Sequence, residues 1–245
     1  MRVAVCTIAK LENRYLREWV EHYHALGVDN IIFFDNNDPG RKGEKISKVI
    51  GDYIKSGFVI VEDVKGKKKW QHKAFNYCYR QYGDRYDWIG FFDIDEFLRF
   101  KNNQNVKEYI SQEHFNGFNC IKINWRTYDD NDLLRVKKHN YSISRFTRTI
   151  DLFNDETKCF LKTNIPEIRI NSSHGALDLD GFTNNFNPVN HAHIVSCNSA
   201  GHPCENVSVV KNLDMDAYVD HYWFKTLEEF INVLGFEKEE IIRNK

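Results

Sequence analysis

The sequence has no excess of either charge and no long apolar run. Its 245 residues carry 34 basic and 35 acidic side chains, which gives a formal net charge of −1. A chain so close to neutral lacks the basic surface with which proteins hold nucleic acid, so we expect no nucleic-acid partner. No stretch approaches the ~20 apolar residues of a transmembrane helix. The apolar stretch at residues 2–9 is too short and wrongly flanked for a signal peptide.

The cysteines lack the CxxC spacing of zinc sites and redox motifs. All six are scattered, most of them in apolar patterns where a free thiol packs as a small hydrophobic side chain. We therefore expect a reducing, cytoplasmic location. The lysine run KGKKK at residues 65–69 is either a solvated loop or an anchor for anionic lipid or phosphate, so peripheral contact with the inner face of a membrane stays open. Nothing in the sequence indicates an oligomeric state.

Short β-rich runs alternate with helical periods in the first half, which predicts an α/β fold with a Rossmann-like, mostly parallel central sheet and flanking helices. Strands are expected at residues 3–9, 31–35, 58–61 and 88–95, with helices between them that end at Gly27, at Gly57 and near Tyr82. The second half has strand patterns at residues 120–125, 158–162 and 168–170, a polar loop at 172–206, and a last helix. Thr226 and Glu229 have the spacing of a capping box for that helix. We expect one domain, residues 1–245.

Two aspartates, Asp93 and Asp95, close the fourth predicted strand. The run WIGFF before them is continuously apolar, as in a central strand buried on both faces. Ligands of open α/β sheets bind at the carboxyl ends of such strands. On a regular strand both aspartates would point the same way, toward one Mg2+ or Mn2+ ion, and Glu96 would face elsewhere. The alternative is a pair of solvated turn aspartates.

Several segments resemble the family 92 glycosyltransferases and their bacterial relatives. KLENRYLREWVEHYHALGVDNIIFFDNND and DWIGFFDIDEFL are similar to the family's K-N-E-x-x-Y-L-x-E-W helix start, its second strand ending in D-N, and its D-x-D-E-F. KCFLKTNIPEIRINSSHG and HYWFKTLEEF resemble its K-x-x-x-[RK]-P segment and its H-Y-x-x-K-[ST]-x-E-E-F ending. Leu11 stands where asparagine is usual, and Thr163 stands where proline is expected.

The resemblance implies a GT-A fold and an inverting, metal-dependent transfer of a hexose from a nucleotide-sugar. Manganese is the usual ion, with Mg2+ as the substitute. UDP-hexose, for example UDP-galactose, is the expected donor. The expected acceptor is a glycan, free or lipid-linked, of surface polysaccharide or lipopolysaccharide. Residues 1–100 would form the nucleotide-sugar-binding half and 101–245 the acceptor-side half, within a fold that has a smaller C-terminal acceptor-side region. The donor-binding residues carried over from the motifs are Thr7, Lys10, Glu12, Asp35, Asn36, Gln71, Asp93 and Lys225.

The metal site implied by the resemblance combines the aspartates with a histidine from the second half. Asp95 is the expected direct ligand, while Asp93 either ligates too or reaches the ribose or a metal-bound water. Neutral imidazole can complete such a site, and we prefer His221 because Lys225 follows four residues later as a cation for the diphosphate. His174 is the alternative ligand, or it lines the acceptor site.

The acceptor side needs a general base and a sugar-binding surface. Asp130 is our first choice for the base, with Asp132 beside it, because a carboxylate commonly takes the acceptor proton. A turn stabilised by Asp and Asn side chains is the competing interpretation of both residues. Trp125, Tyr128 and Trp223 could each stack on a sugar face, although core packing is the more frequent fate of such rings. We assign the acceptor role to Trp125, because it stands beside the acidic loop.

Two other functions compete with glycosyl transfer. A metal-dependent nucleotidyltransferase would share the sheet and the aspartates, but it needs a glycine-rich loop after the first strand, and TIAKLEN has no glycine. A non-catalytic protein that binds a nucleotide-sugar or a glycan would have kept the fold and lost turnover. The intact D-x-D, His221 and Lys225 count against that loss.

Overall fold

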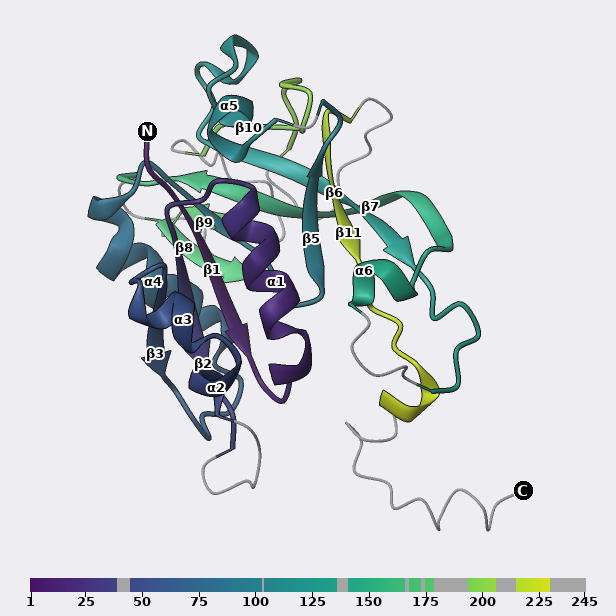
Figure 1. The fold of residues 1–245 in the computed structure, drawn as a ribbon. Helices are drawn as coiled ribbons and strands as arrows, with labels where there is room; N and C mark the ends of the chain where they lie inside the picture. Colours follow the sequence, from purple (N-terminus) through teal and green to yellow (C-terminus); the bar gives the residue numbers. More distant parts are fainter. Residues whose placement is uncertain are drawn as a thin grey trace.

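One sheet of nine strands organises the part of the chain that the structure describes. Its strand order is β3-β2-β1-β4-β7-β6-β11-β5, with β10 paired to β6. A separate two-stranded sheet, β8-β9, lies beside α4 (Figure 1). The computed structural model describes residues 1–38, 45–102, 104–135, 141–165, 168–172, 175–178, 194–205 and 215–229.

The first half is a series of parallel strands joined by helices, as predicted. Strand β1 pairs in parallel with β2 and β4, and β2 with β3. The elements are β1 (Val3–Ala9), α1 (Asn13–Ala25), β2 (Asn30–Asp35), α2 (Ile46–Val49), α3 (Gly51–Lys55), β3 (Val59–Asp63), α4 (Gln71–Tyr82) and β4 (Trp88–Phe91). The single helix expected before Gly57 is instead two short helices, because the backbone at the fully buried Ile50 leaves helical geometry (φ −129°, ψ 28°).

The second half adds antiparallel strands to this sheet. Strand β7 lies antiparallel between β4 and β6, and β5 is antiparallel to β11, which itself runs parallel to β6. The strands predicted around residues 120–125, 158–162 and 168–170 are confirmed, each longer than expected. The elements are β5 (Glu96–Phe100), α5 (Val106–Ile110), β6 (Cys120–Tyr128), α6 (Ser142–Arg145), β7 (Thr149–Lys162), β8 (Ile168–Ser172), β9 (Gly175–Asp178), β10 (Ser196–Cys197) and β11 (Ala217–His221).

Both faces of the central strands are covered by apolar clusters. Alternate residues of β1 divide between them: Val3 and Val5 pack with the buried face of α1, while Ala4 and Cys6 pack with α4 and β8. This double burial explains the continuous apolar runs of the parallel strands. All six cysteines are free thiols, as expected, and all but Cys204 are buried. Within the described ranges, no helix is long and apolar enough to cross a membrane.

Helix α1 fixes the start of β5, which follows the two aspartates. The Trp19 indole N–H donates to the Glu96 carbonyl at 3.0 Å, and the Tyr23 hydroxyl donates to the same oxygen at 3.1 Å. The α/β prediction is confirmed. The turn that carries Asp93 and Asp95 lies between β4 and β5, and α1 stabilises its end through the two hydrogen bonds to Glu96.

Candidate active site

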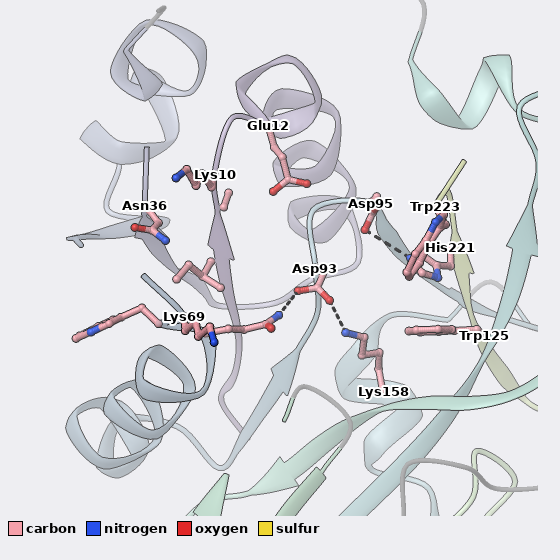
Figure 2. A pocket seen from close by; sticks show the side chains of 14 residues that line it. Lys10, Glu12, Asn36, Lys69, Asp93, Asp95, Trp125, Lys158, His221 and Trp223 are labelled. Atoms are coloured by element: carbon pink, nitrogen blue, oxygen red, sulfur yellow. Dashed lines mark hydrogen bonds and ion pairs between the residues drawn. The ribbon is translucent and has the colours of Figure 1, made fainter. Parts of the chain in front are cut away.

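A pocket of about 600 Å³ opens at the carboxyl edge of β1 and β4. Figure 2 shows it with Lys10 and Asn36 on one side of Asp93 and with Trp125 and Trp223 on the other. The two sides come from the two halves of the chain. The predicted site residues that line it are Lys10, Glu12, Asn36, Gln71, Asp93, Asp95, Trp125 and His221.

Asp93 lies in a turn rather than on a strand. Strand β4 ends at Phe91, so the expectation that a regular strand would point Asp93 and Asp95 the same way is wrong. Gln71 Nε2 donates to Asp93 Oδ1 at 2.9 Å, and Lys158 Nζ donates to Oδ2 at 2.5 Å. Both carboxylate oxygens of Asp93 are therefore engaged by the protein.

Glu96 turns back toward Asp93, so the expectation that it faces elsewhere is also wrong. Its Oε2 accepts the Asp93 backbone N–H at 2.9 Å and lies 3.2 Å from Lys158 Nζ. The Glu96 side chain is fully buried, and this burial raises its pKa to about 8. Burial opposes the charge on Lys158, but Glu96 and Asp93 outweigh it and raise the lysine pKa above its usual range.

Asp95 faces a different set of partners, from β11 and the segment after it. The antiparallel register sets His221 opposite Glu96, which leaves His221 Nε2 3.7 Å from Asp95 Oδ1. Lys225 Nζ lies 3.4 Å from Asp95 Oδ2, outside the pocket lining itself. Burial raises the pKa of Asp95, but Lys225, His221 and Lys158 together outweigh it and keep that pKa below its usual value.

Burial lowers the pKa of His221 to about 4, so its imidazole is neutral near pH 7. A neutral imidazole beside an ionised carboxylate is a donor pair suited to a divalent ion. The distance of 3.7 Å between Asp95 Oδ1 and His221 Nε2 allows one ion to contact both atoms. No group of three or more His, Cys, Asp or Glu side chains that could hold a metal occurs in the described part of the chain. The remaining ligands of an ion would have to come from substrate phosphates and water, as is usual for Mg2+.

The donor-side residues follow the ends of β1 and β2. Glu12 is half-buried, and burial together with the nearby Asp95 raises its pKa to about 8. Asn36 is nearly buried, and its Oδ1 finds no hydrogen-bond partner among the described residues, so a ligand donor could satisfy it. Thr7 and Asp35 are buried and do not line the pocket; Asp35 accepts Lys65 Nζ at 3.1 Å.

The predicted base residues are not brought into this pocket. Asp130 Oδ1 accepts the Asp132 backbone N–H at 3.0 Å, and Asp132 pairs with Arg148 at 3.0 Å. This is the Asp-stabilised turn that was the competing interpretation. His174, the alternative metal ligand, lies outside the described residues, as does most of the polar loop before residue 194.

Trp223, one of the three rings considered for sugar stacking, lines the pocket, and three further polar or aromatic lining residues were not given a site role from the sequence: Lys69, Trp70 and Lys158. Two of them carried a signal. Lys158 opens the KCFLK motif, and Lys69 ends the basic run whose alternative interpretation was a phosphate anchor.

Residues 2–223 match the family described as Glycosyltransferase family 92. A glycosyltransferase family 92 protein of Oryza sativa subsp. japonica is 30% identical over 108 residues, which are 44% of this chain and 18% of that protein. A galactan beta-1,4-galactosyltransferase of Arabidopsis thaliana is 31% identical over 107 residues, 41% of this chain and 20% of that protein. The matched part thus spans about a fifth of the length of these relatives.

Among solved structures, S. aureus TarS 1–349 in complex with UDP-GlcNAc aligns with a TM-score of 0.45 and 12% identity over 67% of this chain and 46% of that one. The family match runs from the first strand to Trp223, the last residue of the pocket lining. The chain therefore belongs to glycosyltransferase family 92.

Proposed function

We propose that the protein is an inverting, metal-dependent glycosyltransferase that moves a hexose from a nucleoside-diphosphate sugar to a glycan. The observation that carries the proposal is the convergence of Asp95 and His221 at a pocket that Lys10 and Asn36 line on the opposite side of Asp93, with Lys225 3.4 Å from Asp95. UDP-galactose is the first donor to test, because some relatives are named galactan beta-1,4-galactosyltransferases.

Asp95 and His221 would hold the divalent ion, Mn2+ or Mg2+, which would act as a Lewis acid on the departing diphosphate. Lys225 adds positive charge on the same side, because its ammonium lies 3.4 Å from Asp95. Gln71 and Lys158 hold the Asp93 carboxylate between the donor side and the acceptor side of the pocket. We expect the carboxylate there to contact a donor ribose or a metal-bound water. Burial in a pocket strengthens each of these charge interactions relative to water.

The acceptor would enter from the side of β6 and β11. A growing surface glycan, lipid-linked or free, and a location at the inner face of the cytoplasmic membrane form part of the proposal. Asp130 stays our predicted base: it lies in the turn after β6, the strand that also carries Trp125 to the pocket.

A donor screen tests this function. The purified protein is incubated with UDP- and GDP-sugars, with Mn2+ or with EDTA, and released nucleotide is measured. We expect release of one nucleoside diphosphate that depends on the ion. Binding of UDP in the presence of Mn2+ without any release over long incubation would instead favour the non-catalytic binding protein, and release of pyrophosphate from a nucleoside triphosphate would favour the nucleotidyltransferase.

A further inference from the structure

Tryptophan is concentrated at the pocket. Of the five tryptophans in the chain, Trp70, Trp125 and Trp223 line it, whereas Trp19 and Trp88 are buried in the core. An indole ring offers a wide apolar face with a polar edge, which suits a pyranose ring with its apolar C–H face and hydroxyl rim. The three lining rings differ in whether such a face is free to receive a ligand.

Two of these rings are already in contact with protein groups. Lys67 Nζ lies over the Trp70 ring, 4.1 Å from its centroid. The Trp125 ring lies 4.2 Å from the His221 ring, centroid to centroid, and Lys158 Nζ lies 5.7 Å from the Trp125 centroid. Trp125 therefore supports the imidazole of His221 and the buried lysine. The role of acceptor platform, which the sequence assigned to Trp125, suits Trp223 better.

Trp223 is the exposed member of the three, with 63% of its surface accessible. Its ring meets the His221 ring at 77° with 5.6 Å between centroids, a T-shaped contact. The backbone on either side is fixed, because Tyr222 N–H donates to the Asp95 carbonyl at 2.9 Å and Thr226 bonds to Glu229. An exposed aromatic ring on such a fixed segment is pre-organised for stacking and loses little freedom when a ligand binds.

We propose that Trp223 is the acceptor platform, on which the terminal pyranose of the acceptor glycan stacks with its C–H face beside Asp95 and His221. The proposal rests on the glycosyl-transfer function proposed above. Figure 2 shows Trp223 next to His221 and Asp95, across Asp93 from Lys10 and Asn36, so the platform lies opposite the donor side. A hydroxyl of a sugar seated there would face the carboxylate and imidazole edge of the pocket.

Glycan-array binding in the presence of UDP and Mn2+ tests the platform, with β-1,4-galactan oligosaccharides among the printed probes. Wild type should bind a subset of glycans, and Trp223→Ala should bind the same subset about tenfold more weakly, since a stacked ring contributes on the order of a tenfold factor. Trp223→Phe should restore most of the binding. Phe224→Ala is the matched control, because Phe224 is an exposed aromatic neighbour that does not line the pocket.

Release of UDP from the donor in the absence of acceptor is measured for the same variants. Retained release with weakened glycan binding supports the platform. Equal glycan binding by wild type and Trp223→Ala, absence of glycan binding by wild type, or an equal loss in Phe224→Ala would overturn it. Absence of UDP release by wild type would refute the proposed function while the array comparison still decides whether Trp223 binds glycan.

Discussion

Lys158 is a buried cation that pairs with two carboxyl groups of the site. Its fully buried ammonium is shared by Asp93 and Glu96. A buried charge of this kind is tolerated only when it is paired, and its removal would leave two carboxylates facing each other. A metal is therefore not required to neutralise Asp93, because Lys158 already pairs with that carboxylate. The sequence could not reveal this, because the partner of a lysine on one strand depends on which strand packs beside it.

Leu11 is held in a conformation that suits another residue. Its backbone φ is +65°, in the left-handed region where asparagine and glycine are favoured and a side chain such as leucine is strained by on the order of 1 kcal/mol. This position is the one where the family motif has asparagine. The strain explains why that residue type belongs there, between Lys10 and Glu12 at the mouth of the pocket.

Leu11→Asn should therefore raise the free energy of unfolding by about 0.5–1 kcal/mol, because the strain falls while the backbone N–H to Asn37 Oδ1 stays in place. Urea unfolding followed by circular dichroism measures it. Leu26→Asn is the matched control: Leu26 is also half-buried, but its φ is −72°, so the substitution there should destabilise. An equal loss of stability at both positions would show that Leu11 is not strained.

At the level of elements, the Glu229 carboxylate connects three segments of the chain: residues 226–229, α6 and α1. Thr226 and Glu229 form the predicted capping box at the start of the helical residues 227–229: Thr226 N–H donates to Glu229 Oε2 at 3.0 Å, and Glu229 N–H donates to Thr226 Oγ1 at 3.2 Å. Glu229 also accepts Arg145 of α6 at 3.0 Å and the Tyr15 hydroxyl of α1 at 2.8 Å. The network fixes the segment that carries Trp223 and Lys225, and only its capping half was visible in the local sequence.

This network predicts an acid-sensitive stability. Burial opposes the charge on Glu229, but hydrogen bonds from Arg145, Thr226 and Tyr15 outweigh burial and lower its pKa to about 2. Because the folded pKa lies below the unfolded value of about 4.3, the contribution, on the order of 2–3 kcal/mol, is present above pH ~4.3 and disappears as pH falls toward 2.

Urea unfolding at pH 7, 4 and 2.5 measures this for wild type and Glu229→Gln. The variant should be less stable at pH 7, and the difference should shrink as the pH falls. The exposed Glu113→Gln serves as the control, with stability close to that of wild type throughout. A constant difference between wild type and Glu229→Gln across this range would contradict the assignment.

The helices and parallel strands of the first half were predictable because each is a local pattern. The end of β4 was not, since Phe92 and Ile94 are fully buried and extend the apolar run past the last paired residue, Phe91. In the site, the strand ends placed Glu12, Asn36 and Asp95 correctly at one edge. Asp130 and Asp132 lie outside the pocket lining and also stabilise their own turn, so their role as the base stays a prediction.

Over the whole molecule, the sheet joins a parallel half to a mixed half through β7. That strand inserts between β6, the strand that precedes it in the chain, and β4, which lies far from it in the sequence. Its place beside β4 is therefore selected by long-range packing. The arrangement confirms an α/β architecture around one central sheet and sets His221 of β11 against Asp95, which precedes β5. The division into a donor half and an acceptor half stays a prediction that the position of the pocket supports.

The central claim is that Asp95 and His221 hold the ion on which glycosyl transfer depends. Its most direct test is a Mn2+ titration of UDP release for wild type, Asp95→Asn and His221→Gln, with the exposed Asp52→Asn as control. We expect Asp95→Asn to lose at least about 100-fold in the rate of UDP release. His221→Gln should need at least about tenfold more Mn2+ for half-maximal release, and Asp52→Asn should match wild type. Full activity of Asp95→Asn with the wild-type Mn2+ dependence would contradict it.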